Sequence, residues 1–221
     1  MNDWLEENVI KSSVWGMRNN KEELFKKQTP DTIVIHHVGS GKKPNLPIVK
    51  TIGSVAATQS VERHHIDVNG WTAGGYHFVI THNAILECRQ VDWQGAHVGR
   101  HNPNKIGILV YGNFNYEEPT SYQKDMLVKL VNNLKATYPK VKKVVTHGDL
   151  ASTMCCGKHL KQFVKTMNKS NWQVEEAHDR DLLLQKIQVY EETLKEIKSS
   201  IEFLQHKLSS IDTINSLENK K

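Results

Sequence analysis

The sequence predicts an α/β domain in which helices flank a central β-sheet, followed by a long C-terminal coiled-coil helix. Two observations lead to this expectation. Short apolar segments that end in polar residues or turns alternate with amphipathic stretches. The composition also changes abruptly, because all 13 Gly, all 6 Pro and all 3 Cys precede residue 168. We therefore expect a globular domain over residues 1–167, a linker over 168–180 and a coiled-coil helix over 181–221.

The elements of the first domain follow from apolar periodicity and turn residues. Residues 3–27 are polar and are expected to be helical, and Gly39 to Pro47 form a loop. In the helix near the end of the domain, five apolar side chains recur at helical spacing and give it one buried face. Strands are expected at 32–37, 76–80, 85–87, 106–111 and 143–146, and helices at 54–66 and 121–138.

The C-terminal segment carries an unbroken heptad pattern. Apolar residues are spaced alternately by four and three residues over four heptads, and Glu and Lys lie between them. A single helix about 45 Å long has nothing of its own to cover such a stripe, so we expect self-association. The alternative is that the helix folds back on the domain. The apolar positions are Leu183, Ile187, Tyr190, Leu194, Ile197, Ile201, Leu204, Leu208 and Ile211.

Charge and hydropathy exclude several classes of protein. The formal net charge is +5, with +7 on residues 1–167 and −2 on residues 168–221. No block of five Lys or Arg occurs, so nucleic-acid binding is not expected. No apolar run is long enough to insert into a membrane. The acidic N-terminus does not resemble a signal peptide, which predicts synthesis in the cytoplasm. Three cysteines, two of them adjacent, favour free or metal-bound thiols.

Two segments supply soft metal ligands. His36 ends the first strand, and a loop with His147 and Cys155 follows the last one. Neighbouring strands would bring the two histidines to one edge, and the eight-residue loop lets the thiol turn back. Two imidazoles and one thiolate leave a fourth position open, as catalytic zinc sites do. The alternative is chance pairing among 12 histidines.

The motifs occur in an order that resembles a known family. They are Ile33-Val34-Ile35-His36-His37, Gly70-Trp71-Thr72-Ala73-Gly74-Gly75-Tyr76-His77-Phe78, Gly95-Ala96-His97, Ile106-Gly107-Ile108 and the segment from His147 to Cys155. Over residues 30–166 the chain is similar to zinc-dependent N-acetylmuramoyl-L-alanine amidases, the type-2 amidase family that includes phage lysins and peptidoglycan recognition proteins. The resemblance implies a mixed sheet and a Zn²⁺ ion held by His36, His147 and Cys155.

The resemblance also implies catalytic roles for two residues. Tyr76 corresponds to the tyrosine that orients the attacking water. The family commonly has Lys at the position of Thr153, whereas the recognition-protein branch has Thr there, as this chain does. The threonine hydroxyl can donate a hydrogen bond to an oxyanion. A second departure is Cys156 in place of Pro, which leaves open whether it replaces Cys155 as the ligand. Leu109 stands where some members have Glu.

Other residues are assigned to the substrate groove or to the core. We expect His37, His65, Trp71 and His97 to line the substrate-binding groove; His37 and His65 are expected to be hydrogen-bonded or to line the cleft, and the alternative for them is metal binding. A structural role is expected for His77, which alternation places opposite Tyr76. Cys88 is expected to be a small buried hydrophobe.

The implied reaction is zinc-dependent hydrolysis of the amide between N-acetylmuramic acid and L-alanine in bacterial peptidoglycan. Without a signal peptide, such an enzyme would be a phage or prophage endolysin released through a holin; a cytosolic enzyme that recycles wall fragments is the alternative. A rival function is a non-catalytic peptidoglycan-binding protein made multivalent by its coiled coil. A structural zinc site would need a fourth ligand, for which Cys156 is the candidate.

Overall fold

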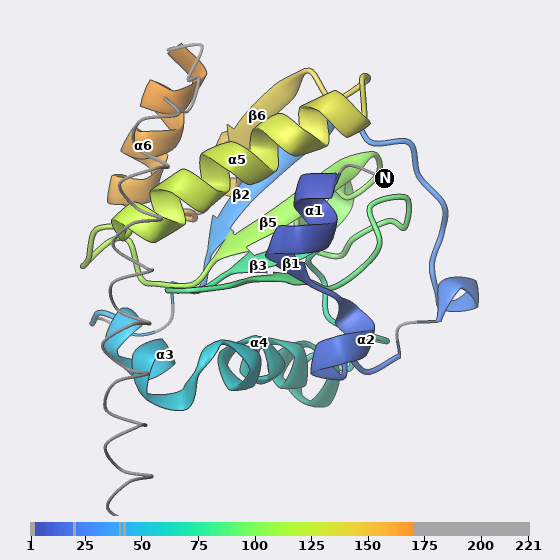
Figure 1. Cartoon of the computed structure of the whole chain (residues 1–221), viewed down its shortest axis with the longest axis horizontal. Coiled ribbons are helices and arrows are strands. Elements are labelled where there is room, and N and C mark those ends of the chain that lie inside the picture. Colours follow the sequence, from blue (N-terminus) through green and yellow to red (C-terminus); the bar gives the residue numbers. More distant parts are fainter. Residues whose placement is uncertain (1–2, 20, 40, 42, 170–221) are drawn as a thin grey trace, which may run out of the picture. The chain divides into compact units, whose positions relative to one another are not determined.

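The computed structural model describes residues 3–19, 21–39, 41 and 43–169, all within one compact unit, Met1–Trp172. Its longer elements alternate between strands and helices (Figure 1). They are α1 (Asp3–Asn8), β1 (Val9–Ile10), α2 (Ser12–Trp15), β2 (Thr32–His37), α3 (Leu46–Ile52), α4 (Ser54–Arg63), β3 (Phe78–Ile80), β4 (Ile85–Glu87), β5 (Lys105–Val110), α5 (Ser121–Thr137), β6 (Lys143–Thr146) and α6 (Lys158–Lys169). Single helical turns occur at Glu22–Leu24, His64–Val68, Gly99–His101 and His147–Asp149.

In the part of the chain that the structure describes, one mixed sheet of six strands has the order β1-β4-β3-β5-β2-β6. Only β3 and β4 pair antiparallel, through the turn at residues 81–84; the other neighbours are parallel. The central strands β2 and β5 are buried almost throughout, as parallel strands covered on both faces must be. The expected α/β domain with a mixed sheet flanked by helices is therefore confirmed.

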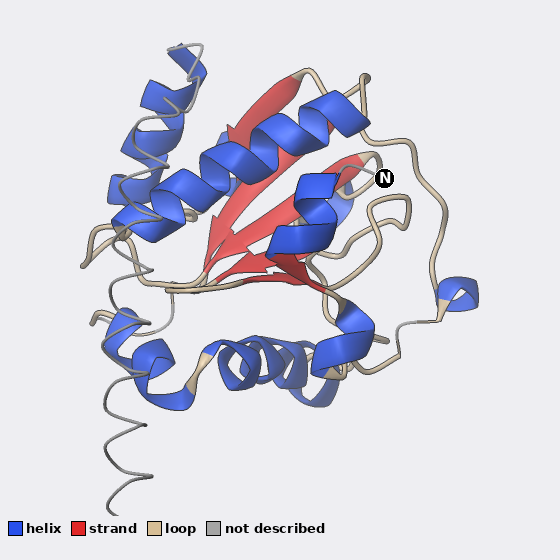
Figure 2. Ribbon diagram, viewed as in Figure 1, coloured by secondary structure: helices blue, strands red, loops and turns tan. Residues whose placement is uncertain are grey.

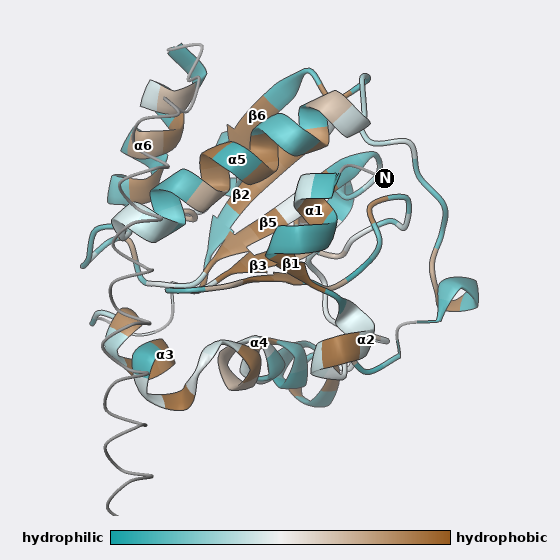
Figure 3. Ribbon diagram, in the orientation of Figure 1, coloured by the Kyte–Doolittle hydropathy of each residue, from teal (hydrophilic) through white to brown (hydrophobic). Residues whose placement is uncertain are grey.

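Helices cover both faces of the sheet (Figure 2). The helices α1 and α5 lie on one face, and α2, α3 and α4 lie on the other (Figure 1). Apolar residues concentrate on the strands and on the sides of the helices that face them (Figure 3). The helix α6 packs against the edge strand β6 and buries Leu160, Val164 and Met167.

The N-terminal segment differs from the expected helix over residues 3–27. It forms two short helices around β1, which pairs with the first two residues of β4. Val9 and Trp15 are buried there, and the Trp15 indole donates a hydrogen bond of 2.6 Å to the Glu87 carbonyl. Pairing and burial at the sheet edge outweigh the helical preference of a polar stretch.

Other boundaries differ by short distances. The helix α3 begins at Leu46, inside the expected loop, with Pro47 in its first turn, where a proline costs no hydrogen bond. The helix α6 was not expected, and it extends to Lys169, so the predicted domain boundary at residue 167 falls inside it. The remainder of the linker over 168–180 and the coiled-coil helix over 181–221 lie outside the described residues. Within the described residues, no helix is long and apolar enough to cross a membrane.

The helix α5 begins with a reciprocal cap. The Thr120 hydroxyl accepts a hydrogen bond from the Gln123 amide, and the Gln123 side chain accepts one from the Thr120 amide, each at 3.1 Å. The Gln123 side chain also donates to the Tyr111 carbonyl at the end of β5, at 2.8 Å. The cap therefore fixes where α5 starts relative to the sheet.

We predict that Thr120→Ala lowers the free energy of unfolding by about 1 kcal/mol, because the Gln123 amide loses its acceptor. Urea denaturation of the full chain measures the change. Thr137→Ala is the control: its hydroxyl bonds only to the Asn133 carbonyl at the exposed end of α5. An equal loss in both variants would contradict a specific role for the cap.

Candidate active site and metal centre

The pairing of β2 with β6 brings two histidines together. The strands are parallel, and the register places Ile35 beside Thr146. A histidine follows each of these two residues. His36 and His147 therefore meet where the strands end, with ring centroids 4.7 Å apart. His36 is 1% exposed, whereas His147 is half-buried at the start of a turn. This juxtaposition agrees with the prediction made from the order of the strands.

A tight loop returns Cys155 to the same place. The Gly148 amide donates to the Cys155 carbonyl at 2.7 Å, which closes the loop at its base. A Cβ at Gly148 would lie 2.7 Å from the Thr153 carbonyl oxygen and 2.8 Å from that of Cys155, so only glycine allows this approach. Asp149 accepts hydrogen bonds from the Thr146 amide and hydroxyl and pairs with Lys161 at 2.8 Å, which fixes the loop against α6.

The three side chains form one cluster of donors. One ligand atom from each of His36, His147 and Cys155 lies within 4.8 Å of the others. The Cys155 Sγ is 3.8 Å from the His36 Nδ1 and accepts a hydrogen bond of 3.4 Å from the His37 amide. Tetrahedral zinc with ordinary bond lengths places a nitrogen and a sulfur ligand about 3.6 Å apart. The donor set and its spacing therefore fit zinc with one position left open.

A second imidazole, that of His97, contacts the His36 ring nitrogen that faces away from Cys155. The His36 Nε2 is 3.0 Å from the His97 Nδ1, so one proton is shared between the two buried rings. If His36 presents the lone pair of Nδ1 to a metal, its Nε2 carries the hydrogen and donates it to His97. A Cβ at Gly107 would lie 2.6 Å from the His97 ring, so the glycine in β5 makes room for this imidazole.

Burial sets the protonation state of the candidate ligands. It lowers the pKa of His36 well below its usual value, with a further contribution from His97 and His147, and it lowers the pKa of His147 as well. Both rings are therefore neutral near pH 7, which is the form that binds metals. Burial raises the pKa of the Cys155 thiol to about 11, although the hydrogen bond from His37 opposes this shift.

Tyr76 and Thr153 each contact a residue of the cluster, His36 and Cys155 respectively. The ring centroid of Tyr76 is 5.1 Å from that of His36, and burial raises the pKa of its hydroxyl. Thr153 is exposed on the returning loop, and its Oγ1 accepts a hydrogen bond of 3.3 Å from the Cys155 amide. Since the hydroxyl is an acceptor in that bond, its own hydrogen is left to donate outward.

Of the four residues expected to line the groove, Trp71 is exposed and the three histidines are buried. Trp71 is 37% exposed and stacks on His65, with ring centroids 4.6 Å apart. His65 is buried and accepts a hydrogen bond from the Gly75 amide, and His37 is buried and accepts one from the Phe114 amide. Burial lowers the pKa of each ring to about 4. His97 contacts His36 as described. Each of the three histidines thus has an internal hydrogen-bond partner.

A pocket of about 430 Å³ opens beside Tyr76. The turn at His64–Val68, a π-helical continuation of α4, forms one wall with His64 and His65. Sequence reasoning gave no signal for this pocket, because its lining comes from four separate segments. The lining residues are Val38, Ser60, Val61, His64, His65, Asn69, Tyr76, Leu109 and Tyr111.

The expected structural residues are buried, as predicted. The His77 Nδ1 accepts from the Gly107 amide at 2.9 Å and its Nε2 is 2.8 Å from the Trp93 carbonyl, so both ring nitrogens are used. Cys88 packs in an apolar cluster with Val79 and Leu86. The contact of His97 with His36 was missed, since 61 residues separate them and only the pairing of β2 with β5 brings their segments together.

The family model described as N-acetylmuramoyl-L-alanine amidase matches residues 26–159, which include every residue of this site. The chain belongs to this family. Among curated relatives of the amidase family, the chain is 28% identical over 167 residues to peptidoglycan-recognition protein SC2 of Drosophila melanogaster, covering 74% of this chain and 87% of the relative. It is 27% identical over 152 residues to the endolysin of Enterobacteria phage K11, covering 66% and 93%.

Solved structures show the same fold. Drosophila peptidoglycan recognition protein SD superposes with a TM-score of 0.62 at 18% identity, covering 76% of this chain and 97% of that chain. The endolysin amidase LysCS of Clostridium intestinale superposes with a TM-score of 0.55 at 24% identity, covering 73% and 95%. The amidase family thus includes lytic enzymes and recognition proteins, and family membership supports an action on peptidoglycan or binding to it.

We predict that His97→Phe weakens zinc binding about 10- to 100-fold, because His36 loses the hydrogen bond that orients its ring. Phenylalanine keeps a flat ring over Gly107, so the packing there is preserved. Competition with a chromophoric chelator measures the affinity of the full chain. His101→Phe, an exposed histidine in the same loop, is the matched control. Equal affinities of the two variants would remove His97 from this role.

Proposed function

We propose that this chain hydrolyses the amide between N-acetylmuramic acid and L-alanine of peptidoglycan, with Zn²⁺ held by His36, His147 and Cys155. The observation that carries the proposal is the cluster of these three donors within 4.8 Å, in a member of the N-acetylmuramoyl-L-alanine amidase family. Three donors leave one coordination position for reaction. A zinc ion bound there supplies Lewis acidity toward the scissile carbonyl and activates water near neutral pH.

The chain's own residues position the reacting groups. The hydroxyl of Tyr76, whose ring packs edge-on against His36, orients the attacking water. Thr153 donates its free hydroxyl hydrogen to the developing oxyanion, because its oxygen already accepts from the Cys155 amide. A neutral hydroxyl stabilises this charge less than a lysine would, so most of the electrostatic stabilisation falls to the metal.

The pocket next to Tyr76 takes the substrate. It has room for a sugar or a few peptide atoms, and hydroxyls, imidazoles and an amide line it. We assign Trp71, through its exposed face, to direct substrate contact. His65 packs against the Trp71 ring. We assign His37 and His97 to the wall of the groove, where their internal hydrogen bonds fix the neighbouring backbone and side chains.

A phage or prophage endolysin is the biological role that we favour, with synthesis in the host cytoplasm and release through a holin. The likeness to the endolysin of phage K11 supports it. Self-association through the C-terminal heptads would place several domains on one insoluble wall. The second candidate is a non-catalytic peptidoglycan-binding protein, which the named recognition-protein relatives favour. The complete set of zinc donors favours the enzyme.

Digestion of purified bacterial wall distinguishes the two. We expect the zinc-loaded full chain to release new L-alanine N-termini without new reducing sugars. His147→Ala and Cys155→Ala should lose zinc and activity together. Binding to the wall without any new N-termini would favour the recognition protein, and new reducing ends would contradict the amidase. Lytic activity in the metal-free variants would exclude the proposed mechanism.

We predict that Tyr76→Phe keeps zinc affinity but lowers kcat by about 10² or more, because the hydroxyl that orients water is lost. Tyr116→Phe removes the same group from an exposed tyrosine outside the pocket and should leave kcat unchanged. Release of the soluble product from a defined muramoyl peptide gives both rates. If kcat is the same in the two variants, Tyr76 takes no part in the reaction.

A further inference from the structure

The positive charge of the described domain is concentrated in its last third. Residues 1–123 carry 12 basic and 12 acidic residues and have no net charge. Residues 124–169 carry ten lysines against two acids, a net charge of +8. This segment contains no arginine. The imbalance is therefore local, and it falls on α5, β6 and α6.

The helix α6 arranges its lysines in one row. Lys158, Lys161, Lys165 and Lys169 are separated by three, four and four residues, so they share a helix face. The other face carries Leu160, Val164 and Met167 and is buried. Like charges four residues apart destabilise a helix. The row contains no acidic residue, so no opposite charge within it offsets this repulsion.

The strand β6 continues the row. The Asn168 side chain donates a hydrogen bond of 2.8 Å to the Val144 carbonyl, which places the last turn of α6 beside the start of β6. Lys142 and Lys143 are exposed there. We call the exposed lysines of α5, of the loop that follows it, of β6 and of α6 the basic ridge. Its members are Lys135, Lys140, Lys142, Lys143, Lys158, Lys165 and Lys169.

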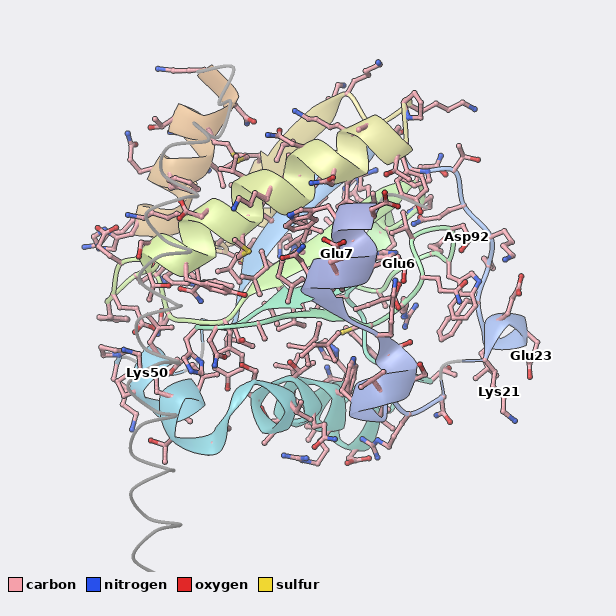
Figure 4. The ribbon with its side chains drawn as sticks, in the orientation of Figure 1. Glu6, Glu7, Lys21, Glu23, Lys50 and Asp92 are labelled. Atoms are coloured by element: carbon pink, nitrogen blue, oxygen red, sulfur yellow. The ribbon has the colours of Figure 1, made fainter. Side chains whose placement is uncertain are left out.

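Two residues of α6 pair with acids, His159 with Glu118 and Lys161 with Asp149, and neither belongs to the ridge. None of its lysines forms an ion pair with another residue in the part of the chain that the structure describes. Side chains that end in nitrogen project outward around α5 and α6 (Figure 4). Lys158 follows Cys155 by only three residues, so the ridge begins at the rim of the metal site.

We propose that the basic ridge binds a linear polymer of polyol phosphates attached to the bacterial wall. This inference rests on the proposed function, which places the wall beside the metal site. Lysines are compact charges on flexible stems, and they suit a repeating phosphodiester chain better than one rigid anion, for which paired arginines are typical. A polymer bound along the ridge holds the open zinc position against the wall, and binding releases the polymer's counterions.

Binding to purified walls with and without this polymer tests the proposal, and a soluble muramoyl peptide reports catalysis separately. The test variant of the full chain is Lys143→Glu/Lys165→Glu/Lys169→Glu. The matched control is Lys21→Glu/Lys26→Glu/Lys50→Glu, which makes the same charge change at exposed lysines elsewhere; Lys21 and Lys50 project from other elements (Figure 4).

We expect the test variant to bind polymer-bearing walls roughly tenfold or more weakly than the control variant at low salt, with a shallower dependence on salt. Both variants should cleave the soluble peptide at the same rate. Removing the polymer from the walls should abolish the difference in binding.

Equal binding of the two variants, or a difference that persists after the polymer is removed, would overturn the proposal. Competition by phosphatidylglycerol–phosphatidylcholine vesicles but not by free polymer would also overturn it, in favour of a membrane surface. Failure of the unmodified chain to cleave the soluble peptide would refute the amidase and would be seen separately.

Discussion

The site depends on the register between β2 and β6. These two strands are parallel neighbours, and the pairing of Ile35 with Thr146 places the following residues, His36 and His147, at one level of the sheet. A shift of the register by one residue would turn one of the two imidazoles to the opposite face. The buried apolar residues of both strands oppose such a shift, so the core of the domain also fixes the geometry of the metal centre.

A second layer of contacts converts this proximity into a pre-organised site. The loop closed at Gly148 returns the thiol of Cys155, and His97 bonds to the ring nitrogen of His36 on the side away from the thiol. Burial keeps the imidazoles neutral while the amide of His37 donates to the sulfur. The donors are therefore held in position before a metal binds, which reduces the cost of ordering them.

Sequence reasoning predicted the sheet and the three donors, because β-branched runs and residues at strand ends carry local signals. It failed for the N-terminal segment, where pairing of Val9 with Ile85 at the sheet edge decides the structure, and for α6, whose amphipathic pattern was not recognised. It gave no signal for the contact between His97 and His36. That contact forms only because β2 pairs with β5, the strand that follows the His97 loop, and because residue 107 of β5 is a glycine. It therefore depends on tertiary packing.

X-ray absorption spectroscopy at the zinc edge of the loaded full chain tests the central claim most directly. The account predicts one sulfur at about 2.3 Å and two imidazole nitrogens at about 2.0–2.1 Å, with a fourth light atom completing the shell. The sulfur contribution should be unchanged in Cys156→Ala, because Cys155 supplies it. Two sulfur atoms, as expected if Cys156 also binds, or no sulfur at all, would contradict a site with three protein ligands and one open position.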